Sequence, residues 1–217
     1  VWRCGGDHPF HPTRKPPIQV LVCCTTSKQS LAIQRKLHAV LPLNMIDWER
    51  TRFDKKNGFG ANTPMVLWKN GSTILFATNE AGPSSVQGNS VDYVAIDELC
   101  SAEMFAELER RILMTGGEMG LSLTPVNAPA KWLEEMVASG AIVEEHAPLT
   151  LLNVCYDDGS LRVLPDGTIC NQAWIDLQWK LTPAAVADVR LNGAWESKPL
   201  GAYFGPGSDG ALALGAG

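Results

Sequence analysis

The sequence lacks the features that place a chain in a membrane, tie it together with disulfides or build a zinc site. None of its 217 residues belongs to an apolar run near the roughly 18 residues of a membrane-spanning helix. Its six cysteines include no CxxC pair, which predicts reduced and mostly buried thiols. The first residues have no basic segment followed by an apolar one, so we expect no signal peptide and interpret Val1 as an internal position of a longer protein.

Positive charge is scarce outside the first part of the chain. Residues 1–60 carry ten Lys and Arg against four Asp and Glu, whereas residues 61–217 carry eight against nineteen. The basic part includes a run of four cations, Arg50, Arg52, Lys55 and Lys56. Such a run is typical of a solvated loop, and it is also the pattern of a surface that contacts phosphates.

Apolar runs alternate with helical periodicity between residues 18 and 140. A further pair of apolar stretches flanks Asn70-Gly71, a dipeptide that predicts a hairpin turn. Alternating strands and helices are typical of the α/β class, with a mostly parallel sheet and helices on both faces. The expected strands and helices are, in order, at 18–24, 27–41, 93–96, 104–112, 119–123 and 129–139.

The pattern changes beyond residue 148. Two apolar stretches, 149–156 and 161–164, flank a polar turn and predict a hairpin. Two short helices are expected at 174–181 and 183–191. These elements form a small hairpin-and-helix appendage to the α/β fold.

Composition and pattern together divide the chain into three parts. We expect a first domain at 1–147, where strands and helices alternate, and an appended subdomain at 148–204. Residues 205–217 are a low-complexity tail rich in glycine and alanine.

A buried strand that ends in two carboxylates is the first candidate for chemistry. The apolar stretch Tyr93–Ile96 leads directly into Asp97 and Glu98. Ligands of open α/β sheets bind beyond the carboxyl ends of the strands. There the first acid can hold Mg²⁺, and the second, aimed differently because side chains alternate, can orient a water towards a γ-phosphate. This arrangement has the shape of a Walker B motif.

A second buried strand ends in hydroxyl side chains. Ser122 and Thr124 stand at the end of the stretch 121–125, where they would lie beside the same ligand or would cap the next helix. The polar loop Ser84–Ser90 precedes the strand of the two carboxylates and is expected at the same edge of the sheet.

In their order along the chain, these motifs resemble the ATPase domain of the large terminase subunit of tailed phages, the motor that packages DNA. The resemblance covers about residues 1–204 and depends on the order of its motifs. They are VWRC with HPF at the start, QRK at 34–36, NGS at 70–72, QGNS at 87–90, DYVAIDE at 92–98, Glu107-Leu108 with Arg111, SLTP at 122–125 and RLNGAWE at 190–196.

The resemblance implies a RecA-like, P-loop NTPase-type fold and a role for each candidate residue. Asp97 would bind Mg²⁺ and Glu98 would be the catalytic glutamate of ATP hydrolysis. Ser122 and Thr124 would couple hydrolysis to domain motion. The segment from Asn79 to Gly88, with Gln87, would line the nucleotide edge, and Arg111 is a candidate arginine finger.

The resemblance also implies partners and a location. Motors of this family act on double-stranded DNA in the host cytoplasm, as homo-oligomeric rings, together with a portal protein and a small terminase subunit. The resemblance implies no membrane partner. Mg²⁺ and ATP are the implied cofactors.

The sequence departs from the family pattern in three ways. It contains no GxxxxGK[ST] loop, so we expect little or no turnover by this chain alone. It has Gln87 where many terminases carry an arginine. The nuclease domain of the family is also missing. Two alternatives stay open: a DExx-box helicase-like translocase, and a non-catalytic prophage remnant or DNA-binding module.

Overall fold

The structure is a computed structural model that divides the chain into two compact units, Val1–Leu123 and Thr124–Gly217. The first unit ends one residue after Ser122, the last residue of the sheet's final strand. Each unit is considered by itself. The structure describes residues 15–60, 64–124, 131–144, 148–150, 154–155, 159–164 and 166–192.

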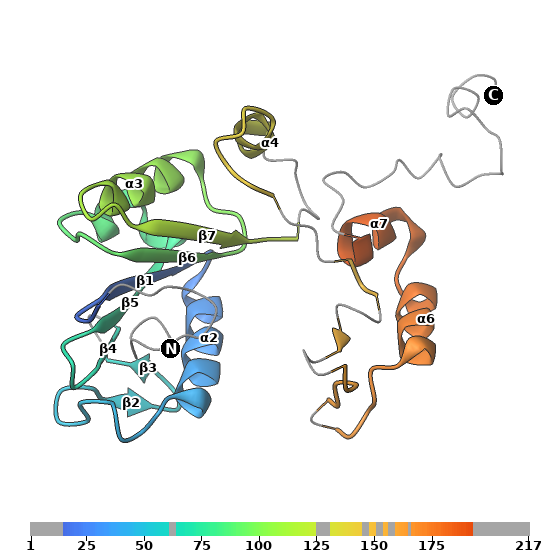
Figure 1. Cartoon of the computed structure of the whole chain (residues 1–217), viewed down its shortest axis with the longest axis horizontal. Helices are drawn as coiled ribbons and strands as arrows, with labels where there is room; N and C mark the ends of the chain where they lie inside the picture. Colours follow the sequence, from blue (N-terminus) through green and yellow to red (C-terminus); the bar gives the residue numbers. More distant parts are fainter. Residues whose placement is uncertain are drawn as a thin grey trace. The chain divides into compact units, whose positions relative to one another are not determined.

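A five-stranded sheet forms the centre of the first unit, in the order β4-β5-β1-β6-β7 (Figure 1). β1 pairs in parallel with both β5 and β6, and β6 pairs in parallel with β7, whereas β4 is antiparallel at one edge. This confirms the expected α/β class with a mostly parallel sheet. The strands are β1 (Gln19–Cys24), β4 (Met65–Leu67), β5 (Thr73–Thr78), β6 (Tyr93–Asp97) and β7 (Glu118–Ser122).

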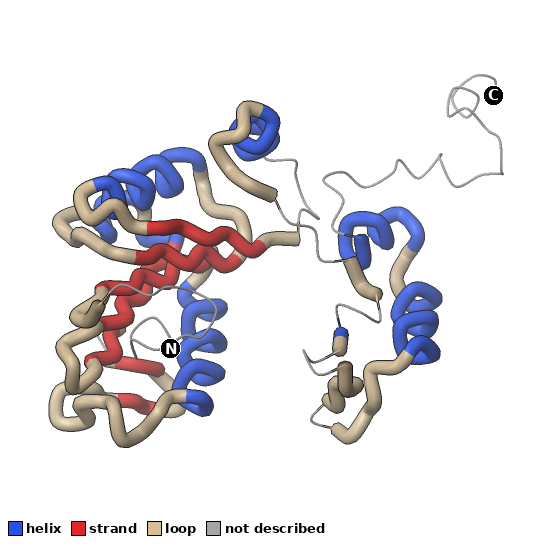
Figure 2. Tube along the Cα trace, viewed as in Figure 1, coloured by secondary structure: helices blue, strands red, loops and turns tan. Residues whose placement is uncertain are grey.

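Two helices make the connections between parallel strands. α2 (Ser27–Val40) follows β1 on the way to β5, and α3 (Ala102–Leu113) links β6 to β7. The two connections cross the sheet in opposite directions. Right-handed crossovers in opposite directions place their helices on opposite faces. Figure 2 shows the helices in blue beside the red strands.

The main hydrophobic core lies between α2 and one face of the sheet. Val20, Ile74 and Phe76 come from alternate positions of β1 and β5 and so share that face. Ile33 and Leu37 of α2 pack against them. The buried members of this core are Ile18, Val20, Leu41, Ile46, Phe59, Val66, Trp68, Ile74 and Phe76.

A short hairpin packs beside α2 and contributes Phe59 to the same core. It consists of β2 (Phe53–Asp54) and β3 (Gly58–Phe59), which pair in antiparallel fashion. The buried side chain of Gln34 on α2 accepts a hydrogen bond from the Phe59 N–H at 2.8 Å. The hairpin and the helix therefore form one packed element.

The second unit contains three described helices. They are α4 (Lys131–Ala138), α6 (Gln172–Leu181) and α7 (Ala184–Asn192). α6 and α7 confirm the two short helices expected at 174–181 and 183–191. Isolated bridges join Cys155 to Leu161 and Val163 to Ile169. The tail at 205–217 and the VWRC and HPF motifs lie outside the described residues.

Within the ranges that the structure describes, none of the helices combines the length and the apolar character that a membrane span requires.

Candidate functional site

The carboxyl ends of the parallel strands bring the candidate residues into one row. Cys24 at the end of β1 is in register with Thr78 of β5 on one side and with Asp97 of β6 on the other. Asp97 is in turn in register with Ser122 of β7. Neighbouring strands lie about 4.8 Å apart, so these side chains are close neighbours on one face. Asp97 and Ser122 are exposed.

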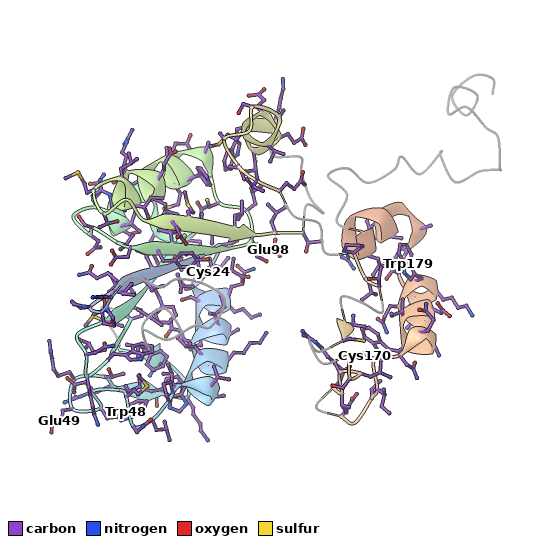
Figure 3. The ribbon with its side chains drawn as sticks, in the orientation of Figure 1. Cys24, Trp48, Glu49, Glu98, Cys170 and Trp179 are labelled. Atoms are coloured by element: carbon purple, nitrogen blue, oxygen red, sulfur yellow. The ribbon has the colours of Figure 1, made fainter. Side chains whose placement is uncertain are left out.

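Glu98 has a backbone conformation that is unusual for its residue type. Its φ is 68°, in the left-handed region, and no other non-glycine residue of the described ranges has a positive φ. Its N–H donates a 2.7 Å hydrogen bond to the carbonyl oxygen of Ser122. Backbone strain of this kind persists only where the surroundings enforce it, and it is concentrated at functional sites. Figure 3 labels Glu98 and Cys24 near the ends of β6 and β1.

The strain at Glu98 leads to a stability prediction. A side chain in the left-handed region costs about 1 kcal/mol that glycine does not incur. We therefore expect the free energy of unfolding of Glu98→Gly to be about 1 kcal/mol larger than that of Glu98→Ala, because alanine keeps the Cβ atom. Urea unfolding followed by circular dichroism compares the two variants. Equal stability of the two would show that the backbone at residue 98 carries no such strain.

The helix N-termini at this edge are closed by the chain's own side chains. The Thr26 side chain caps α2 and forms a capping box with Gln29. The Glu80 carboxylate accepts a hydrogen bond from the Ser27 N–H at 3.0 Å. The capping box is a local pattern, whereas Glu80 was not identified from the sequence because Ser27 lies 53 residues away. The carboxylate of Glu80 occupies the position where a helix N-terminus would otherwise attract a phosphate.

Asn79 connects this edge to α3. Its Oδ1 accepts a hydrogen bond from the Ser101 N–H at 3.0 Å. Ser101 is the N-cap of α3, and its hydroxyl accepts a bond from the Met104 N–H. The predicted edge residue Asn79 is thus a positioning residue, which holds the start of α3 next to the loop that follows Asp97.

Two further predicted residues lie on the exposed turn after a 3-10 helix at Pro83–Val86. Gln87 is exposed, and Gly88 has a φ of 81° with open space where a Cβ would stand. Among the described residues, no hydrogen bond joins the Gln87 side chain to the row of Asp97 and Ser122. Thr124 is the first residue of the second unit and does not belong to this row.

Arg111 lies at the other end of the sheet. Its carbonyl oxygen accepts a 3.1 Å bond from the N–H of Val91, which precedes β6. Asp97 is six positions after Val91, a span of about 20 Å in an extended chain. The guanidinium forms an ion pair with Glu107 at 2.9 Å and is 22% exposed. Arg111 therefore does not reach Asp97 of its own chain.

Burial disfavours the thiolate form of the cysteines near the site. Burial raises the pKa of Cys23 to about 12 and the pKa of Cys100 to about 11. Burial also raises the pKa of Cys24, and the charges of Asp97 and Glu80 add to this effect, while a hydrogen bond with Ser30 opposes it. A thiolate at neutral pH is therefore disfavoured at all three positions.

One exposed carboxylate at this edge is of the kind that can hold a hydrated Mg²⁺, and the helix N-termini there are already capped. Among the described residues, no group of three His, Cys, Asp or Glu side chains is arranged to hold a metal directly. Mg²⁺ keeps several waters and is commonly bound by one or two carboxylates plus phosphates, and the exposed Asp97 fits that role. The helix N-termini that would cradle phosphates are closed by Thr26, Glu80 and Ser101.

Comparison with known proteins adds no family to this picture. No family model matches the chain, and no curated protein is significantly similar to it.

Proposed function

We propose that the chain is part of the ATP-hydrolysing motor domain of a terminase large subunit, with a RecA-like, P-loop NTPase-type fold, and that it has little or no turnover by itself. The observation that carries the proposal is the junction of β6 and β7. Asp97 and Ser122 stand in register there, and the strained Glu98 is hydrogen-bonded to the backbone of Ser122. An acid pair at the carboxyl edge of a parallel sheet suits Mg²⁺-dependent phosphoryl transfer.

Each residue of the junction has a defined task in this proposal. Asp97 would hold a hydrated Mg²⁺, which would supply positive charge beside the phosphates. Glu98 orients a water and accepts its proton as the oxygen attacks the γ-phosphorus and the bond to ADP breaks. Ser122 contacts Glu98 through its carbonyl oxygen, so a shift of β7 is passed to the catalytic carboxylate and, through Thr124, towards the second unit.

The partners follow from the same proposal. Double-stranded DNA is the translocated substrate, and a homo-oligomeric ring, a portal protein and a small terminase subunit complete the motor. Arg111 is available as an arginine finger only to a neighbouring subunit, because in its own chain it lies at the far end of the sheet.

Weak nucleotide binding is the expected property of this chain alone. Without a GxxxxGK[ST] loop, the phosphates lose their main backbone contacts. We expect Mg·ATP to bind with a dissociation constant of about 1 mM, which corresponds to about −4 kcal/mol.

The test is a titration of a fluorescent ATP analogue in the presence and absence of Mg²⁺. We expect binding that requires Mg²⁺ and that disappears in Asp97→Asn. Glu109→Gln is the matched control, since it removes one exposed carboxylate from α3, away from the edge. Binding that is insensitive to Asp97→Asn, or no saturation at about ten times the expected dissociation constant, would contradict the proposal.

A second function is favoured by the closed helix N-termini. The bonds of Glu80 to Ser27 and of Asn79 to Ser101 leave both helices capped without a ligand. A DNA-binding module without turnover, such as a prophage remnant, would have this property. It predicts no nucleotide binding together with intact binding of DNA.

A further inference from the structure

Five cations lie on α2, on the hairpin packed beside it and on the segment that leads into that hairpin. Arg35 lies on the helix, Arg50 and Arg52 lie on the segment that leads into β2, and Lys55 and Lys56 lie on the hairpin turn. All five are exposed. We call this set the basic surface.

The basic surface is built on a rigid support. The Arg35 Nε donates to the carbonyl oxygen of Lys55 at 2.8 Å, which ties the helix to the turn. His38 of α2 stacks on Phe53 of β2, with ring centroids 3.8 Å apart. The Gly60 N–H donates to the carbonyl oxygen of Arg52. These contacts hold the backbones of the cations in place before any partner binds, which lowers the entropic cost of binding.

The five cations of the basic surface outnumber the three carboxylates of the same segment, which are Asp47, Glu49 and Asp54. None of the five cations, all of them in the described part of the chain, takes part in the ion pairs of α3, which join Glu107 to Arg110 and Arg111. The neighbouring carboxylates of Asp54 and Asp47 are occupied by backbone N–H groups. Asp54 accepts bonds from Lys56 and Asn57, and Asp47 accepts one from Arg50.

We propose that the basic surface contacts the phosphate backbone of duplex DNA without reading its sequence. Protein interfaces are depleted in lysine and have an apolar or aromatic centre. The basic surface carries lysine and arginine beside one partly exposed aromatic side chain, Trp48, which is 37% exposed. The Trp48 ring packs edge-on against His38, and its N–H is bonded to Leu43. Single-stranded partners need several stacking platforms, so a duplex fits better.

The basic surface lies apart from the candidate nucleotide edge. Figure 3 labels Trp48 and Glu49, which immediately precede Arg50, on the opposite side of the first unit from Glu98. The proposal shares duplex DNA as a partner with the proposed motor function, but it depends only on the charge and geometry of this surface. DNA binding and nucleotide binding are therefore separable in experiment.

The test measures the anisotropy of a fluorescent duplex of arbitrary sequence as the full chain is added. Five phosphate contacts predict a slope of about −4.5 for the logarithm of affinity against the logarithm of salt concentration. Affinity should fall by about 10²- to 10³-fold between about 50 and about 200 mM salt.

A charge-matched pair of triple variants locates the contact. Arg52→Gln/Lys55→Gln/Lys56→Gln removes three cations of the basic surface, and we expect a slope about 2.7 units shallower with affinity at least about tenfold weaker. Lys28→Gln/Lys69→Gln/Lys131→Gln removes three exposed cations elsewhere, with the same change in net charge. The second variant should keep the slope of the unmodified chain.

Several outcomes would overturn the assignment. They are equal losses in the two triple variants, no binding to the duplex at low salt, tighter binding to a single strand of the same length, and equal displacement of the duplex by polyglutamate. Asp97→Asn separates this proposal from the motor function, because it should abolish nucleotide binding and leave DNA binding unchanged.

Discussion

Gly58→Ala should destabilise the first unit by about 3 kcal/mol. Gly58 has a φ of 81°, and a Cβ there would stand 2.2 Å from the Gln34 Oε1. The Gln34 side chain has no room to move, because its Oε1 accepts the Phe59 N–H and its Nε2 donates to the Ser30 hydroxyl. The substitution adds left-handed strain and leaves a buried N–H without its acceptor, and thermal unfolding measures the sum.

Gly88→Ala is the matched control for that experiment. Gly88 also has a φ of 81°, but nothing lies within 4 Å of the position of a Cβ. This variant should lose about 1 kcal/mol from backbone strain alone. Equal losses in the two variants would show that the Gln34 contact contributes nothing. A larger loss in Gly58→Ala would also show that the support of the basic surface depends on this contact.

Leu108→Ala should cost about 3 kcal/mol of folding free energy. Leu108 is 0% exposed on α3, and the substitution leaves a cavity between the helix and the sheet. The same helix offers Leu113, which is 69% exposed, as a control whose substitution by alanine should change stability by less than about 0.5 kcal/mol. Urea unfolding of both variants gives the comparison. Similar losses would mean that α3 is not packed as described.

The sheet and its helices were predictable because they depend on local periodicity. The apolar run at 18–24, the helix ended by Pro42 and the Asn70-Gly71 turn each carry their signal within a few residues. The meeting of Asp97 with Ser122 was also predictable, since carboxyl ends of parallel strands share one edge. In the structure, Asp97 and Ser122 are in register on the neighbouring strands β6 and β7.

Other features depend on residues that are distant in the sequence. Arg111 was identified as a helix residue, but its place far from Asp97 follows from α3 running back along β6, so that its last turn meets Val91. Periodicity also did not reveal that the sheet-bearing unit ends at Leu123, because a helical pattern at 129–139 does not say which sheet the helix joins.

The sequence by itself determined the α/β class, the order of the elements, the pair of carboxylates at the end of a buried strand and the absence of a phosphate-binding loop. Each of these is a property of neighbouring residues. Only the tertiary structure decided that Glu98 is held in a left-handed conformation, that Glu80 closes the start of α2 and that Arg35 joins the cations of the hairpin. Those features arise where segments at least 20 residues apart in the sequence meet, and local patterns carry no information about such contacts.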